Sequence, residues 1–101
     1  MNDLNFPELS QAVLDPPTLQ ALLRDLTTQT RVLSVTVKGG EQHHAQAADS
    51  SLSQAVESLL RGEIRGVQVR YLWQDREWLD TLLRCAEGIR IVRSYHEIGT
   101  P

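Results

Sequence analysis

The chain has 101 residues, of which 41% are hydrophobic, and a formal net charge of −3. This size and composition are typical of one folded domain with a single core, so we treat residues 1–101 as one domain. The negative charge excludes the broad basic patch that nucleic-acid binding requires, and no apolar run is long enough to span a bilayer. We therefore expect neither nucleic acid nor membrane as a partner.

The first quarter of the chain predicts a loose end followed by helix. Residues 1–6 are expected to be a loose N-terminus, and residues 7–14 to form one or two helical turns beginning at a proline. Pro16 ends this segment, because a proline disfavours helix in the residue before it. Asp15 is suited to cap a second helix, from Pro17 to about Thr28, in which the apolar residues have helical spacing: Leu19, Leu22, Leu23 and Leu26.

A strand and another helix follow. Residues 31–38 predict a strand with Leu33, Val35 and Val37 on one face. Gly39-Gly40 indicates a turn, after which residues 41–47 form either an exposed edge strand or a loop. A capping box, Ser51 with Gln54, starts the next helix at Ser51, and Gly62 ends it at the position after the C-cap.

Three strands are predicted between Gly66 and Tyr95, as an antiparallel meander over 67–73, 78–84 and 89–95. A two-residue turn at Asp75-Arg76 would place Trp73 opposite Trp78 and Tyr71 opposite Asp80. A loop over 85–88, with Gly88 at positive φ, would place Asp80 opposite Arg93 and Trp78 opposite Tyr95.

These elements predict an α+β fold with a mainly antiparallel sheet of four or five strands and two helices packed on one face. One face of the meander combines aliphatic and aromatic side chains with the Asp80–Arg93 pair. If the helices cover this face, the exposed one carries Arg70, Leu72, Leu79, Thr81, Leu83 and Val92. The reverse arrangement is also open.

Ligands for a metal are few. His43, His44, His96 and Cys85 are the only histidines and cysteine, and their spacing matches no known zinc site. We expect no metal and no cofactor. The single cysteine excludes an internal disulfide and, with no signal peptide at the N-terminus, favours a cytoplasmic location. We interpret Cys85 as an unreactive thiol.

The Asp80–Arg93 pair, with Tyr71 beside it, has two interpretations. It is either an ion pair that fixes strand register at the rim of the sheet, which we favour, or the floor of a small pocket walled by Trp73, Trp78 and Tyr95. For the ion pair, we expect Arg93→Ala to destabilise the fold by about 1–2 kcal/mol, between the costs of exposed and buried pairs.

Aromatic and arginine side chains cluster around the first hairpin of the meander. Such residues are enriched at the energetic centres of protein interfaces. We therefore predict a small non-enzymatic accessory domain that binds another protein, or a second copy of itself, through an open sheet face. The alternative is a small-molecule-binding or catalytic domain with its pocket at Tyr71, Asp80 and Arg93. The candidate interaction residues are Arg70, Tyr71, Trp73, Trp78, Asp80, Arg93 and Tyr95.

Overall fold

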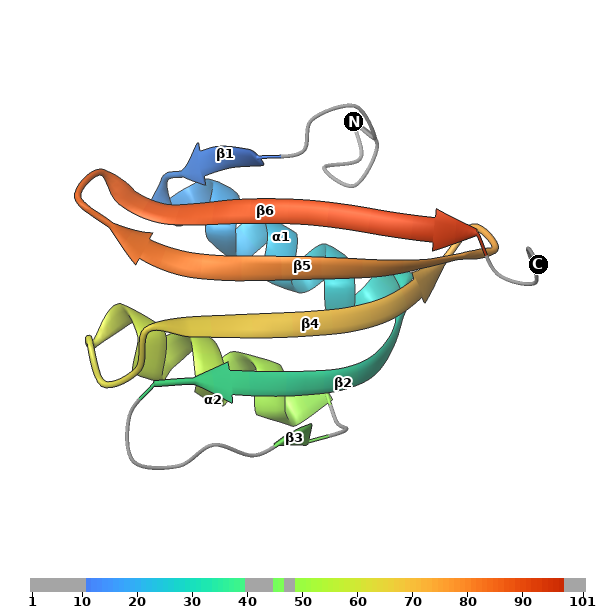
Figure 1. Cartoon of the computed structure of the whole chain (residues 1–101), viewed down its shortest axis with the longest axis horizontal. Coiled ribbons are helices and arrows are strands. Elements are labelled where there is room, and N and C mark those ends of the chain that lie inside the picture. The colour runs from blue at the N-terminus through green and yellow to red at the C-terminus, as the bar shows by residue number, and fades with distance from the viewer. Residues whose placement is uncertain (1–10, 40–44, 47–48, 98–101) are drawn as a thin grey trace.

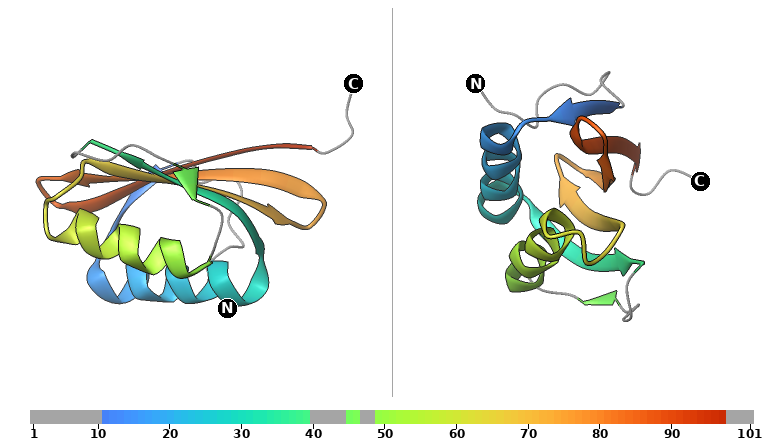
Figure 2. Two further views of the ribbon diagram at one scale, coloured as in Figure 1. Left: turned by 90° about the horizontal axis from the view of Figure 1, so that it is seen from below. Right: turned by 90° about the vertical axis from the view of Figure 1, so that its left-hand side faces the viewer.

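The computed structural model describes residues 11–39, 45–46 and 49–97. It has one six-stranded antiparallel sheet with the order β1-β6-β5-β4-β2-β3, and both helices lie on the same face of it (Figures 1 and 2). The strands are β1 (Gln11–Leu14), β2 (Arg31–Lys38), β3 (Ala45–Gln46), β4 (Gly66–Trp73), β5 (Arg76–Cys85) and β6 (Gly88–Glu97). The helices are α1 (Pro16–Gln29) and α2 (Asp49–Leu60). The predicted α+β class is confirmed.

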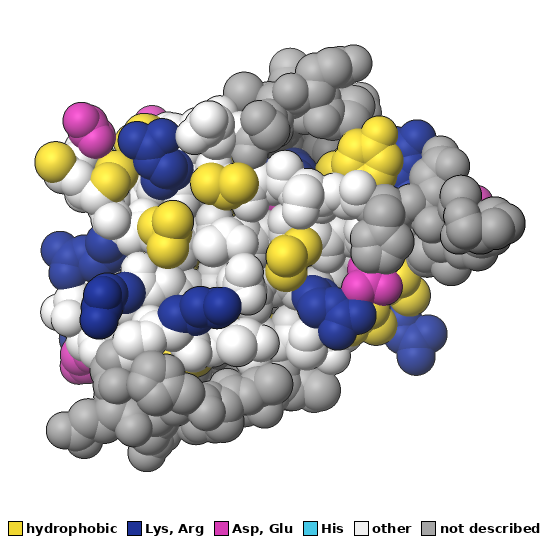
Figure 3. Space-filling view, in the orientation of Figure 1, with side chains coloured by type: hydrophobic (Ala, Val, Ile, Leu, Met, Phe, Trp, Pro, Cys, Tyr) yellow, Lys and Arg dark blue, Asp and Glu magenta, His cyan; other side chains and the backbone are white. Residues whose placement is uncertain are grey.

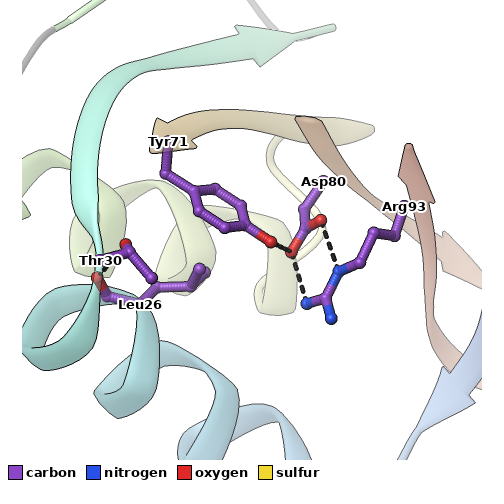
Figure 4. Close-up of polar contacts among 5 residues, drawn as sticks. All are labelled: Leu26, Thr30, Tyr71, Asp80 and Arg93. Atoms are coloured by element: carbon purple, nitrogen blue, oxygen red, sulfur yellow. Dashed lines mark hydrogen bonds and ion pairs between the residues drawn. The ribbon is translucent and has the colours of Figure 1, made fainter. Parts of the chain in front are cut away.

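Helix α1 forms as its sequence predicts. The Asp15 carboxylate accepts a hydrogen bond of 2.8 Å from the backbone N–H of Thr18, which satisfies one of the free donors in the first turn. Leu19, Leu22 and Leu26 are buried against the sheet. Thr30, just after the helix, donates its hydroxyl to the carbonyl of Leu26 (Figure 4).

The helical turns predicted for residues 7–14 are wrong where the structure describes them. Residues 11–14 form β1, which pairs antiparallel with β6, from Gln11 opposite Val92 to Leu14 opposite Ile89. Ala12 and Leu14 pack against the core, whereas Val13 is exposed. This alternation has the period of a strand, and pairing with a sheet edge overrides the weak local preference for helix. Residues 1–10 lie outside the described residues.

Strand β2 contains an irregularity that its sequence did not reveal. The register with β4 shifts between Val32 and Ser34, which makes Leu33 the bulged residue. Val35 and Val37 both contact the core, as predicted, but the third residue that does so is Val32 and not Leu33. The described part of the predicted returning segment is the short edge strand β3; residues 40–44 and 47–48 lie outside the described residues.

Helix α2 begins two residues before the predicted start, so the capping box at Ser51 is wrong: Ser51 lies inside the helix. The predicted end is confirmed. Gly62 has φ of +81°, its N–H bonds to the Leu59 carbonyl and the Glu63 N–H bonds to the Ser58 carbonyl, the paired bonds of a Schellman motif.

The meander is confirmed, but one of its two registers is not. The first turn is Gln74-Asp75, both at positive φ, so Trp73 pairs with Arg76 and Tyr71 with Trp78. The predicted register was therefore two residues out. A shift of two keeps every side chain on its own face, which is why the predicted faces remain correct. The second register is as predicted, although the ladder closes further, to Cys85 opposite Gly88.

The helices cover the aromatic face of the meander. The buried core joins the three α1 leucines to α2 and to the inner face of β4, β5 and β6. Its members on the meander are Val67, Val69, Tyr71, Trp78, Leu82, Ile89 and Ile91. The other face of the sheet is covered by none of the helices and strands that the structure describes (Figure 2).

Gly62→Ala should destabilise the fold by about 1–2 kcal/mol, because a left-handed backbone is costly for a residue with a Cβ. That Cβ would also collide with the end of the Arg84 side chain. Gly62→Asn is the matched control and should cost less, since asparagine tolerates this conformation. Urea unfolding measures both variants. If Gly62→Ala were as stable as the wild type, a strained left-handed backbone at this position would be contradicted.

Candidate functional site

The candidate site residues Tyr71, Asp80 and Arg93 meet beneath the helices, on three neighbouring strands. Asp80 and Arg93 lie directly opposite each other on β5 and β6. Arg93 donates from Nε to Oδ1 and from Nη2 to Oδ2 of Asp80, each over 2.8 Å. The Tyr71 hydroxyl donates to Oδ2 over 3.0 Å. Figure 4 shows the phenol and the guanidinium approaching the carboxylate from different sides.

This group is buried in the core. The Asp80 side chain is 0% exposed and that of Arg93 3%. Burial raises the pKa of Tyr71 well above its ordinary value of 10.0, and the negative charge of Asp80 raises it further. Burial alone would lower the pKa of Arg93, but its hydrogen bonds to Asp80 and the negative charge there outweigh it and raise this pKa. No buried side-chain polar atom among the described residues lacks a hydrogen-bond partner.

Next to this group, a row of aromatic rings runs across the same face. Tyr71, Trp78 and Tyr95 lie opposite one another on β4, β5 and β6, with ring centroids 6.4 Å and 4.7 Å apart. The ring centroids of Trp73 and Trp78 lie 5.9 Å apart, and the Trp78 indole N–H donates to the Trp73 backbone carbonyl. The Arg76 guanidinium lies 4.5 Å from the centre of the Tyr95 ring, a cation–π distance. The expected proximity of Trp73 and Trp78 is confirmed despite the different register.

The structure divides the seven candidate interaction residues into two groups. Four are buried, and these are Tyr71, Trp78, Asp80 and Arg93. Three reach the surface: Trp73 is half-buried, Tyr95 is 43% exposed at the end of the aromatic row, and Arg70 is exposed on the opposite face of the sheet. Direct contact with a partner is therefore open only to the second group.

The opposite, open face mixes apolar with polar side chains (Figure 3). Strand alternation places five aliphatic residues there, and these are Val13, Leu72, Leu79, Leu83 and Val92. Polar pairs separate them. Gln68 donates to the Thr81 hydroxyl over 3.2 Å, and Arg70 donates from Nε to Glu77 over 2.8 Å. The apolar area is consequently divided into small patches.

Charge on this face differs from that of the whole chain. The registers place Arg31, Lys38, Arg70 and Arg90 on it, while Glu77 is the acidic residue that the described strands contribute. A chain of net charge −3 thus presents a face with an excess of cations. This asymmetry was not predicted from the sequence, because the residues that form it come together only through the pairing of the strands.

Few other groups of the described residues suggest chemistry. No three of their histidine, cysteine, aspartate and glutamate side chains come together in a way that would hold a metal ion. His43 and His44 lie outside the described residues, so the prediction about metal stays a prediction. None of the described helices has the length and hydrophobicity of a membrane span. A hollow of about 520 Å³ lies beside the end of α2, near Cys85.

Comparison of the chain with models of protein families, with curated proteins and with solved structures found no match.

Arg93→Ala should destabilise the fold by about 3–5 kcal/mol, more than the sequence alone suggested, because it leaves the Asp80 charge buried without its partner. A double-mutant cycle with Asp80→Ala, followed by urea unfolding, measures the coupling. The exposed pair Arg70–Glu77 on the same sheet is the control and should couple by about 0.2–1 kcal/mol. Equal coupling energies in the two cycles would contradict a buried, structural pair.

Stability should fall as the pH rises above about 10, because the raised pKa keeps Tyr71 protonated in the folded chain while it ionises in the unfolded one. Below that pH the contribution of this tyrosine is complete. Each pH unit above 10 should lower the free energy of unfolding by up to about 1.4 kcal/mol, which is the free energy that corresponds to one unit of pKa. Tyr71→Phe is less stable at neutral pH but lacks this decrease. Unfolding measured from pH 8 to 11.5 compares the two slopes, and parallel slopes would refute the assignment.

Proposed function

We propose that this protein is a small non-enzymatic adaptor that binds another protein through the open face of its sheet. The main support is that the described helices leave one face of the six-stranded sheet uncovered. Five aliphatic side chains lie on this face among cations. Val92 and Leu83 are more than a third exposed. Exposed apolar area bordered by polar groups is typical of protein interaction sites.

The charge of this face indicates the chemistry of the partner. Arg31, Lys38 and Arg90 exceed the acidic side chains there, and Arg70 already pairs with Glu77. A complementary surface is acidic at its rim and apolar between its charges, because opposite potentials attract partners and exclude wrong ones. We infer a protein partner with such an acidic surface.

A second copy of the chain fits this face less well. Two copies placed face to face would bring the same excess of cations together, and like charges in contact are costly. Stable homodimer interfaces are also more apolar than this face, whose aliphatic residues are separated by hydrogen-bonded polar pairs. Self-association is therefore one of the outcomes that the experiment below distinguishes.

The geometry gives less support to a pocket at Tyr71, Asp80 and Arg93. Both carboxylate oxygens of Asp80 already accept hydrogen bonds from inside the chain, and the carboxylate is inaccessible to solvent. A ligand or substrate would have to displace the bidentate bonds of Arg93 to reach it.

The single cysteine remains the reason for proposing a cytoplasmic setting.

Site-specific photo-crosslinking in the native host tests the proposal. A photo-reactive residue at Val92, on the open face, should capture one acidic protein, whereas the same residue at Gln20, exposed on α1, should not. Capture of only a second copy of the chain would contradict a heterologous partner. Equal capture at both positions, or at neither, would overturn the assignment of the face.

Binding of the captured protein, once purified, then gives the decisive measurement. Val92→Glu should weaken binding at least about tenfold, because it places a like charge against an acidic surface and removes an apolar contact. Gln20→Glu makes the same change of charge on the helical side and should leave the affinity unchanged. Rising salt should weaken binding. Loss of affinity in both variants, or in neither, would refute the interface.

A further inference from the structure

The hollow beside the end of α2 joins three parts of the chain. It is lined by Gly62, Ile64, Arg65, Leu83, Arg84 and Cys85. Two glycines allow the side chains of β5 to pack closely at this end of the sheet. The end of the Arg84 side chain lies against Gly62, and the Leu83 side chain lies against Gly66, where an added Cβ would come within 2.9 Å of Leu83 Cδ2. Its volume of about 520 Å³ lies in the range of small-molecule sites.

Two arginines of the hollow have guanidinium groups without a side-chain partner among the described residues. No ion pair and no side-chain hydrogen bond joins the guanidinium of Arg65 or Arg84 to another group in the part of the chain that the structure describes. Arg61 differs, because Glu57 and Glu63 both pair with it. Lys38 adds positive charge at the same end of the sheet, since its carbonyl accepts from the Arg65 N–H over 2.9 Å.

The remaining wall is apolar. Ile64 packs against the core, and Leu83 and Cys85 line the β5 side. In Figure 3, dark-blue side chains gather over the left-hand end of the open face, where β2 ends and β4 begins. A hollow lined by both arginines and carbon surface is complementary to a molecule that combines an anionic group with an apolar part.

We propose that this hollow is a binding site for a small organic anion, with Arg65 and Arg84 holding a carboxylate or phosphate group and the apolar wall receiving its carbon skeleton. The guanidinium fork matches the oxygens of both groups, so their shared chemistry is what the site recognises. Leu83 borders both this hollow and the proposed protein interface, but Arg65 and Arg84 do not belong to that interface, so variants of the two arginines and Val92→Glu test the two proposals separately.

Titration of the full ¹⁵N-labelled chain with benzoate, acetate and inorganic phosphate tests the site, with sodium chloride at equal ionic strength as the reference. We expect saturable shifts in the backbone amides of residues 64–66 and 83–85. Tighter binding of benzoate than of acetate would support the apolar wall, and the order of benzoate and phosphate identifies the preferred anion. Shifts that do not saturate, or that chloride reproduces, would overturn the proposal.

Neutral variants with a matched control localise the binding. Arg65→Gln and Arg84→Gln should each weaken the tightest anion at least about fivefold, the effect of losing a charge-assisted hydrogen bond. Arg24→Gln removes the same charge from the exposed face of α1 and should leave the affinity unchanged. Equal losses in all three variants would mean general attraction by net charge, and unchanged affinity in both pocket variants would likewise refute the site. Should Arg84→Gln prevent folding, Arg65→Gln decides alone.

Discussion

The buried contact of Arg93 with Asp80 is the constraint on which the rest of the sheet depends. Both charges lie beneath the helices, where an unpaired ion is far more costly than any single apolar contact is favourable. Slipping β6 by two residues along β5 would keep the apolar side chains inside but would separate these charges. The pair therefore excludes registers that hydrophobicity alone cannot distinguish. Because the open face is the reverse side of the same strands, its pattern of cations and aliphatic groups is fixed by the pair as well.

The fold was largely predictable, since it follows from local periodicity. The leucine spacing and the Asp15 cap were sufficient to predict α1. Gly62, which adopts a left-handed conformation, was sufficient to predict the end of α2. The failures share a cause, which is that tertiary partners decide between nearly equal local choices. Residues 11–14 became a strand because the edge of β6 was available, and Leu33 bulged where β2 and β4 differ in register. The first hairpin turned one residue earlier than predicted, because Gln74 and Asp75 adopt positive φ without any glycine to signal it.

The candidate site was predictable only as a set of residues, not as a surface. The sequence identified the Asp80–Arg93 pair and the aromatic row, but it could not say that the helices would bury them. Burial favours a scaffold role for most of these groups, and the interface that we propose lies on the reverse side of the strands. There the informative residues are scattered along the sequence, from Arg31 to Arg90, and only the sheet order brings them together. The surface that we propose as an interface therefore has no sequence motif.

The pairing of β1 with β6 also has a consequence for how the chain assembles. The strands of the meander follow one another directly, so their ladders close short loops, whereas Gln11 must find Val92 near the other end of the chain. Closing a long loop costs more chain entropy, and such contacts form late in folding. We expect the meander and its helices to assemble first and β1 to dock last. The edge of β6 is then uncovered for part of every folding event, and β1 is the first strand to detach when the native state opens locally.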